Sequence, residues 1–214
     1  MNSYPPYDLD LEVQASTFSD LIVRVVPINR PEELPGLLVY EGGNVSWIQW
    51  ALLHRQLLVR GAITIGNIFI DDEMVFGPGL NRAHLLESKH SLNPRVIVDP
   101  VAFEEAIRVN RSTKLEGWNP REALQIVFKR DFDGFRFVDY LSTTALKCIE
   151  DRDASSLMIH KNKIIEGLAA SDLSVRTKYE WLCSYHNETV EFFAGDLTSR
   201  CKSPKDDLVI QSNQ

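Results

Sequence analysis

Short β-branched runs alternate with stretches of helical periodicity along the first half of the chain, and this alternation is what most limits its fold. Residues 11–14 and 21–26 are apolar-rich segments separated by a polar connection, which predicts a β-hairpin with Asp20 near its turn. The prolines and glycine of residues 27–40 then indicate a loop. Asn44, after two glycines, is a typical N-cap and should begin a helix.

Apolar residues recur at helical spacing from there to about Arg60, so one face of this helix should lie on a sheet. Gly61 ends the helix, and residues 62–70 are rich in β-branched residues with an internal glycine, which predicts a strand. An acidic turn at residues 71–73 leads to a short strand at residues 74–76. The spacing then predicts a helix from Leu80 to about Lys89.

A further strand is expected at residues 95–100, followed by helices at residues 101–110 and 145–173. Residues 132–141 carry aromatic and aliphatic side chains that suit a last hairpin or a packed loop. Hairpin, helix, strand, short strand, helix and strand in that order predict an α+β sandwich. We expect a domain at residues 1–110 and a mainly helical extension, packed on it, at residues 111–214.

Composition limits the function classes open to this chain. With 214 residues and 44% hydrophobic content it can bury one substantial core, and its net charge of −7 argues against general nucleic-acid binding. Its three cysteines are widely spaced, and neither a secretion signal nor a run of about 18 apolar residues occurs. We therefore expect a cytoplasmic protein that acts neither on nucleic acid nor in a membrane.

Four segments, taken in order, resemble a known enzyme family. They are Phe-Ser-Asp-Leu-Ile-Val at 18–23, Arg-Gly-Ala-Ile-Thr-Ile-Gly at 60–66, Phe-Gly-Pro-Gly-Leu-Asn-Arg at 76–82 and Arg-Val-Ile-Val at 95–98. Together they resemble the class III nucleotidyl cyclases, and most of all the pyrimidine cyclases of the bacterial Pycsar antiphage system. Two later segments, at 131–141 and 178–187, resemble the C-terminal extension of that group.

The resemblance implies a ferredoxin-like class III cyclase sandwich that lacks its first strand and carries a helical C-terminal extension. It implies an enzyme that converts UTP or CTP to cyclic UMP or cyclic CMP with release of pyrophosphate, using Mn²⁺ or Mg²⁺ at a two-metal site. It further implies a cytoplasmic homodimer whose product signals to an effector encoded nearby, without direct contact.

The resemblance also assigns roles to individual residues. Asp20 corresponds to a metal-binding aspartate, and hard cations prefer such carboxylate oxygens. Asn81 corresponds to the asparagine that stabilises the transition state, and Arg60 could present its guanidinium to phosphate oxygens. Each has a structural alternative: Asp20 as a turn aspartate, Asn81 as a polar residue of a first helical turn, and Arg60 as a solvated cation at a helix end.

The chain also departs from the family pattern. The family's first metal aspartate lies on a strand that has no counterpart here, and Asp8 and Asp10 lie too close to the hairpin to replace it. Leu85 stands where purine cyclases carry an arginine, which leaves that role to Arg60, Arg82 or another arginine. Two alternatives follow: a degenerate or truncated cyclase-like protein that binds nucleotide or dimerises without catalysis, and an unrelated α+β interaction module.

Overall fold

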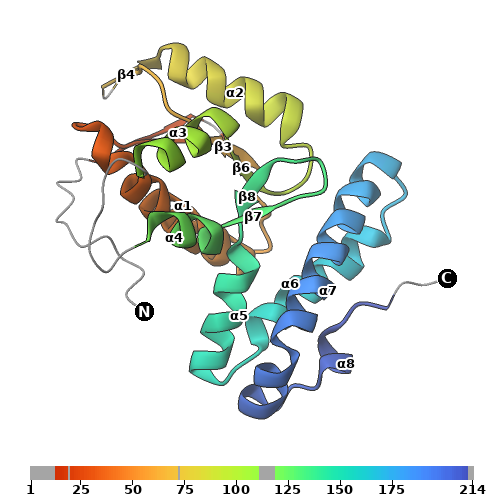
Figure 1. The fold of residues 1–214 in the computed structure, drawn as a ribbon. Coiled ribbons are helices and arrows are strands. Elements are labelled where there is room, and N and C mark those ends of the chain that lie inside the picture. Colours follow the sequence, from red (N-terminus) through yellow and green to blue (C-terminus); the bar gives the residue numbers. More distant parts are fainter. Residues whose placement is uncertain (1–12, 19, 72, 111–118, 212–214) are drawn as a thin grey trace. The chain divides into compact units, whose positions relative to one another are not determined.

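The computed structural model describes residues 13–18, 20–71, 73–110 and 119–211, and it forms two compact units (Figure 1). The first unit comprises residues 1–44, 61–91 and 96–138, and the second comprises residues 45–60, 92–95 and 139–214. The structure confirms a mixed α+β chain with a helical C-terminal region. The predicted division near residue 110 stays a prediction.

A four-stranded mixed sheet forms the centre of the first unit. Its strands lie in the order β3 (Gly61–Ile63), β6 (Val96–Val98), β8 (Arg136–Val138) and β7 (Phe128–Arg130). The pair β3 and β6 is parallel, whereas β6 with β8 and β8 with β7 are antiparallel. The carboxyl ends of β3 and β6 therefore lie at the same edge of the sheet.

The first unit also contains the helices α2 (Pro78–His90), α3 (Pro100–Asn110) and α4 (Pro120–Val127). All three residues of β6 are buried, as an inner strand requires. The ring of Phe103 from α3 meets that of Phe128 edge to face, with centroids 6.2 Å apart. Two hairpins complete the unit: β1 (Gln14–Phe18) with β2 (Leu21–Val25), and β4 (Phe69–Ile70) with β5 (Val75–Phe76).

The second unit is helical. Helices α5 (Tyr140–Asp151), α6 (Ser155–Leu168) and α7 (Leu173–Cys201) pack against one another, and the short α8 (Lys205–Leu208) contacts α6 and α7 (Figure 1). Leu141, Leu157, Leu182 and Leu197 are fully buried among these helices. In the part of the chain that the structure describes, no helix is long and apolar enough to cross a membrane.

The predicted loop at residues 27–40 is confirmed only for residues 27–30, and the predicted helix start at Asn44 is wrong. A short 3₁₀ helix at Pro31–Glu33 leads directly into α1 (Leu34–Leu53), which passes through Asn44 without a break. Pro35 lies in the first turn, where its missing N–H leaves no helical hydrogen bond unmade. Gly42 is there for close packing: an added Cβ would overlap the side chains of Val127 and Phe128.

Other boundaries also differ from the prediction. The first hairpin strand is Gln14–Phe18, later than residues 11–14, and Asp20 lies at the turn as predicted. Helix α1 ends at Leu53, before Arg60, in a turn where Gln56 adopts a left-handed φ of 60°.

Two long predicted elements are interrupted. The strand expected at residues 62–70 is split between β3 and β4, and the helix expected at residues 145–173 is broken at Ala154. Arg152, with a left-handed φ of 57°, ends α5 just before that break.

Two adjacent glycines of α1 give a matched test of packing. Gly42→Ala should lower the free energy of unfolding by about 1–3 kcal/mol, because the methyl group has no room. Gly43→Ala should raise it by about 0.5–1 kcal/mol, because an added Cβ at Gly43 meets nothing within 4 Å and alanine favours the helix. Urea unfolding followed by circular dichroism measures both, and equal effects at the two positions would contradict the packing explanation.

Candidate functional site

Three of the four resemblance segments meet at the carboxyl edge of the parallel pair β3 and β6. Thr64 directly follows β3 and Asp99 directly follows β6, and the Asp99 N–H donates to the Ile63 carbonyl over 2.8 Å. Helix α3 begins immediately after Asp99, and α2 packs on both strands. Such an edge is where α/β proteins commonly place ligand-binding groups.

The glycine turn before α2 packs backbone to backbone against the segment that follows β3. The Gly79 N–H donates to the Asn67 carbonyl over 2.9 Å, and a Cβ on Gly66 would lie 2.9 Å from the Gly79 Cα. Gly77 adopts a φ of +139°, which side-chain-bearing residues rarely reach. These glycines therefore fix the start of α2 beside the sheet edge.

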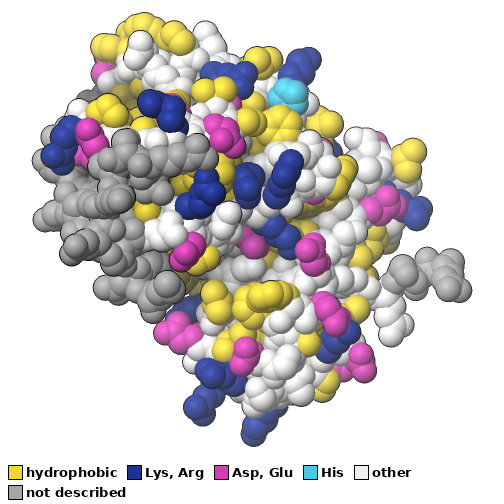
Figure 2. All heavy atoms as spheres, in the orientation of Figure 1, with side chains coloured by type: hydrophobic (Ala, Val, Ile, Leu, Met, Phe, Trp, Pro, Cys, Tyr) yellow, Lys and Arg dark blue, Asp and Glu magenta, His cyan; other side chains and the backbone are white. Residues whose placement is uncertain are grey.

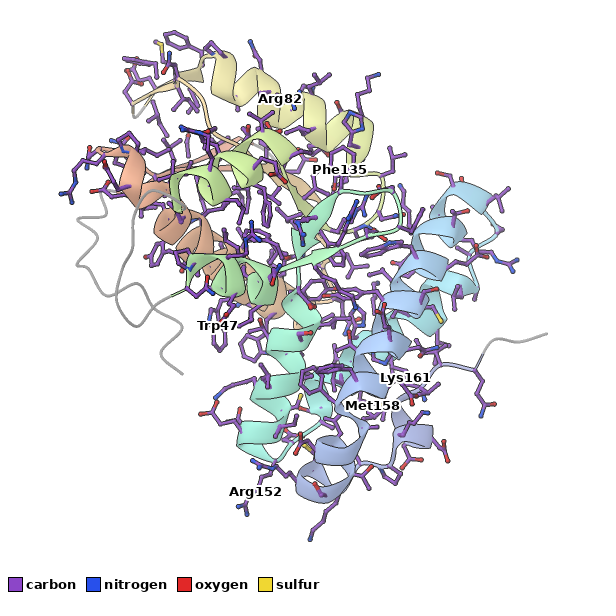
Figure 3. All side chains as sticks on the ribbon, in the orientation of Figure 1. Trp47, Arg82, Phe135, Arg152, Met158 and Lys161 are labelled. Atoms are coloured by element: carbon purple, nitrogen blue, oxygen red, sulfur yellow. The ribbon has the colours of Figure 1, made fainter. Side chains whose placement is uncertain are left out.

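Asp99 organises the polar side chains at this edge. Arg82 of α2, labelled in Figure 3, donates from Nε and Nη2 to the two Asp99 carboxylate oxygens over 2.9 and 3.0 Å. Thr64 Oγ1 donates to Asp99 Oδ2 over 2.7 Å, and the Val101 N–H donates to Oδ1 over 3.1 Å. Asp99 thus accepts four hydrogen bonds and also caps α3.

The charge of Asp99 is stabilised although the residue is buried. Burial alone would raise the pKa of its carboxyl group, but the hydrogen bonds from Arg82, Thr64 and the Val101 N–H outweigh it, so the pKa lies below its usual value. Asp99 therefore stays ionised at neutral pH, and the Arg82 guanidinium at this edge is already paired with a carboxylate.

Asn81 lies beside this cluster. It is exposed in the first turn of α2, one residue before Arg82, and its backbone N–H donates to the Gly77 carbonyl over 3.1 Å. Its side chain is therefore accessible to a ligand near the N-terminus of the helix, where the helix dipole favours anions. This position suits the role that the resemblance implies for Asn81.

Neither Asp20 nor Arg60 is among the residues that bond to the Asp99 carboxylate. Asp20 is exposed at the tip of the β1–β2 hairpin. Arg24 of β2 anchors that hairpin to α1 through two hydrogen bonds of 3.1 Å to the Glu41 carboxylate. Arg60 is exposed immediately before β3 and belongs to the second compact unit.

The described residues contain no group of three or more His, Cys, Asp or Glu side chains placed to hold a metal ion. Asp8 and Asp10 lie outside the described residues. Asp20 is thus the predicted metal ligand for which the structure gives a position, and its exposed carboxylate suits a hard cation.

Hydrophobic side chains are exposed on the β4–β5 hairpin of the first unit. Phe69 and Phe76 stack with ring centroids 4.9 Å apart on β4 and β5, and both are about half exposed, as is Met74. Figure 2 shows hydrophobic side chains gathered at this end of the unit. A shallow hollow of about 220 Å³ lies nearby, lined by Gln14, Ala15, Ile70 and Asp71.

Asp99 and Thr64 were not among the site residues predicted from the sequence. A signal was present, because an aspartate that ends a buried strand and precedes Pro100 is well placed to cap a helix. Thr64 had no such signal, since its contact with Asp99 depends on the parallel pairing of two strands far apart in the sequence.

Comparisons with known proteins give no relative for this chain. No protein-family model, no curated protein and no solved structure matches it significantly.

Replacing Asp99 tests whether it organises this edge. Asp99→Asn should lower the free energy of unfolding by about 1–3 kcal/mol, because an amide N–H₂ group would face the donors of Arg82 or Thr64. Glu105→Gln, which breaks an exposed ion pair with Arg108, should change it by less than about 1 kcal/mol.

Acid should remove the same contribution in the unaltered protein. The folded-state pKa of Asp99 is lowered, so its stabilisation is present above the ordinary aspartate pKa and is lost as the pH falls toward the folded value. The difference between the unaltered protein and Asp99→Asn in urea unfolding should therefore shrink below about pH 4. A difference that is constant from pH 7 to pH 3 would contradict this role.

Proposed function

We propose that this chain is a nucleotidyl cyclase of the class III type that converts UTP or CTP to the 3′,5′-cyclic monophosphate and pyrophosphate. The observation that carries the proposal is the meeting of three resemblance segments at one sheet edge, where the glycine turn sets Asn81 and Arg82 at the start of α2. The dipole of α2 favours an anion at this helix start, although Pro78 has no N–H and the Gly79 and Asn81 N–H groups already donate to the Asn67 and Gly77 carbonyls.

Each residue has a role in this proposal. The Asn81 amide would orient the ribose or donate to the reacting phosphate, and Arg60 or Arg82 would balance charge on the departing pyrophosphate. Asp20 would hold Mn²⁺ or Mg²⁺ together with substrate phosphates, an arrangement in which magnesium needs only one or two protein carboxylates. The metal would neutralise phosphate charge and favour attack by the ribose 3′-oxygen.

The proposal extends to assembly and signalling through the resemblance alone. We propose that the enzyme acts as a cytoplasmic homodimer and that its cyclic nucleotide signals in antiphage defence to an effector encoded nearby. The fold of a complete class III cyclase sandwich is part of the same proposal.

A second candidate is a cyclase-like protein that binds nucleotide without turning it over. The pairing of Arg82 with Asp99 favours it, because a guanidinium already held by two hydrogen bonds to a carboxylate is less available to phosphate. In this case Asn81 and the start of α2 would bind the triphosphate, and Arg82 would serve stability.

Product analysis tests the enzyme directly. The purified protein is incubated with each of the four ribonucleoside triphosphates and Mn²⁺, and products are identified by mass spectrometry. We expect a cyclic pyrimidine nucleotide, and Asp20→Ala should reduce its formation at least about 100-fold by removing the metal ligand. Asp196→Asn, which removes an exposed carboxylate of α7, should leave the rate unchanged.

Nucleotide binding separates the two candidates. If no triphosphate yields a product while UTP or CTP still raises the melting temperature, and Asn81→Ala abolishes that rise, the non-catalytic candidate holds. If the triphosphates neither react nor bind, both are wrong, and the interaction module remains.

A further inference from the structure

The motif Tyr185-His186-Asn187 on α7 takes no part in the proposed reaction, yet each of its side chains has a structural partner within the second unit. The Tyr185 hydroxyl donates to Asp139 Oδ1 over 2.6 Å and accepts from the Leu141 N–H over 3.0 Å. This ties the start of α5 to α7. His186 and Asn187 instead hold the segment that ends the described chain.

That segment, residues 205–210, is here called the C-terminal strap. Asn187 pairs twice with Ile210: its Nδ2 donates to the Ile210 carbonyl over 2.9 Å, and its Oδ1 accepts from the Ile210 N–H over 2.8 Å. Lys161 of α6, labelled in Figure 3, donates to the Asp207 carbonyl over 2.7 Å. Leu208 is fully buried, and Ile210 packs with Ile164 and Leu182.

His186 links the strap to a buried chain of hydrogen bonds. Its Nε2 lies 3.0 Å from the Leu208 carbonyl oxygen, and its Nδ1 lies 3.0 Å from His160 Nδ1. His160 Nε2 lies 2.9 Å from the Tyr140 hydroxyl oxygen. Both histidines are fully buried, and their rings stack with centroids 5.1 Å apart.

The proton positions in this chain follow from one fixed acceptor. The Leu208 carbonyl can only accept, so His186 Nε2 carries a hydrogen and its neutral ring leaves Nδ1 as an acceptor. His160 Nδ1 must then donate, which makes His160 Nε2 the acceptor for the Tyr140 hydroxyl. Every polar atom is satisfied with two neutral rings.

An added proton disturbs this arrangement. A protonated His186 has hydrogens on both nitrogens, so its Nδ1–H would face the Nδ1–H of His160 at 3.0 Å. If His160 moved its hydrogen to Nε2, the Tyr140 hydroxyl would have to accept, and its own proton would lose the acceptor it has here. Both outcomes also place a charge in a fully buried site.

The surrounding groups do not offset that charge. At α5, the nearby groups are the Tyr140 hydroxyl and the Asp139 carboxylate, and that carboxylate already accepts from Tyr185 and Ser142. At α6, the nearby charged group is Lys161, which is itself a cation. At α7, the groups are Tyr185 and Glu191, and the Glu191 carboxylate pairs with Lys205 of α8. The carboxylates of Asp206 and Asp207 on α8 are exposed to solvent. No described carboxylate bonds to either imidazole. Burial lowers the pKa of His160 well below its usual value and that of His186 to about 4.

We propose that the C-terminal strap is an acid-released latch, held on α6 and α7 by the neutral His160–His186 pair and freed when that pair takes up a proton. Release breaks the bond from His186 to Leu208 and uncovers the apolar surface of Ile164 and Leu182. The latch is a property of the second unit and does not depend on the proposed enzyme activity.

Amide hydrogen exchange by NMR on the full chain tests the latch. The reporter is the Ile210 amide, which donates to Asn187, and the reference is the Val190 amide in the middle of α7. Linkage between a latched pKa of about 4 and a released value of about 6.5 predicts that protection of Ile210 falls about 30-fold from pH 7.5 to pH 5. Exchange rates are corrected for their intrinsic pH dependence, and Val190 should stay protected.

Two variants and one control sharpen the test. His186→Gln keeps an N–H donor for the Leu208 carbonyl but does not titrate, so protection of Ile210 should change less than about twofold over the same range. Asn187→Ala removes bonds that do not titrate, so the strap should release at a higher pH. Because Ile210 loses its acceptor in this variant, release is followed there at the Val209 amide, which donates to the Lys205 carbonyl within the strap. His84→Gln, at an exposed position on α2, should behave as the unaltered protein.

Three results would overturn the proposal. The first is equal protection of the Ile210 amide at pH 7.5 and pH 5. The second is a loss of Ile210 protection in His186→Gln as large as in the unaltered protein. The third is a simultaneous loss of protection at Val190, which would mean that the whole unit unfolds. If His186→Gln fails to fold, the shift in Asn187→Ala decides, and an unchanged release pH there contradicts the latch.

Discussion

The carboxylate of Asp99 is the point on which the first unit depends. The backbone N–H of Asp99 joins β6 to β3, and its side chain caps α3. The two carboxylate oxygens also accept hydrogen bonds from Thr64 and Arg82. A strand pair, the start of one helix and the side of another are therefore fixed by one residue. An ionised carboxylate with four donors can do this in a buried position because its charge is fully satisfied.

Local sequence patterns predicted those helices and strands whose residues prefer, on their own, the conformation that the packed structure gives them. The hairpin around Asp20, helix α2, strand β6 and helix α3 were all found from β-branched runs, glycine turns and helical spacing. The start of helix α1 was misplaced because Pro31, Pro35 and Gly36 indicated a loop and Asn44, after two glycines, indicated an N-cap, whereas the helix includes Pro35 and Gly36 and packs Gly42 against Val127 and Phe128. A glycine required by packing and a glycine that ends a helix have the same appearance in a sequence.

In the candidate site, too, one feature could be predicted from the sequence and another could not. The position of Asn81 at an accessible helix start follows from the glycine turn before it, which the sequence displays. The pairing of Arg82 with Asp99 could not be predicted, because it joins residues 17 positions apart that only the packing of α2 on the sheet brings together. That pairing matters for function, since it decides how far Arg82 is available to a phosphate.

The later resemblance segments have a structural explanation that is independent of catalysis. Asp139, Tyr140 and Leu141 at the start of α5 meet the motif Tyr185-His186-Asn187 on α7 through hydroxyl, imidazole and backbone groups. A buried polar network of this kind has one low-energy arrangement, because every donor needs its acceptor. Such a network specifies helix register more strictly than apolar packing does, and the two neutral histidines within it are the groups through which we propose that acid releases the strap.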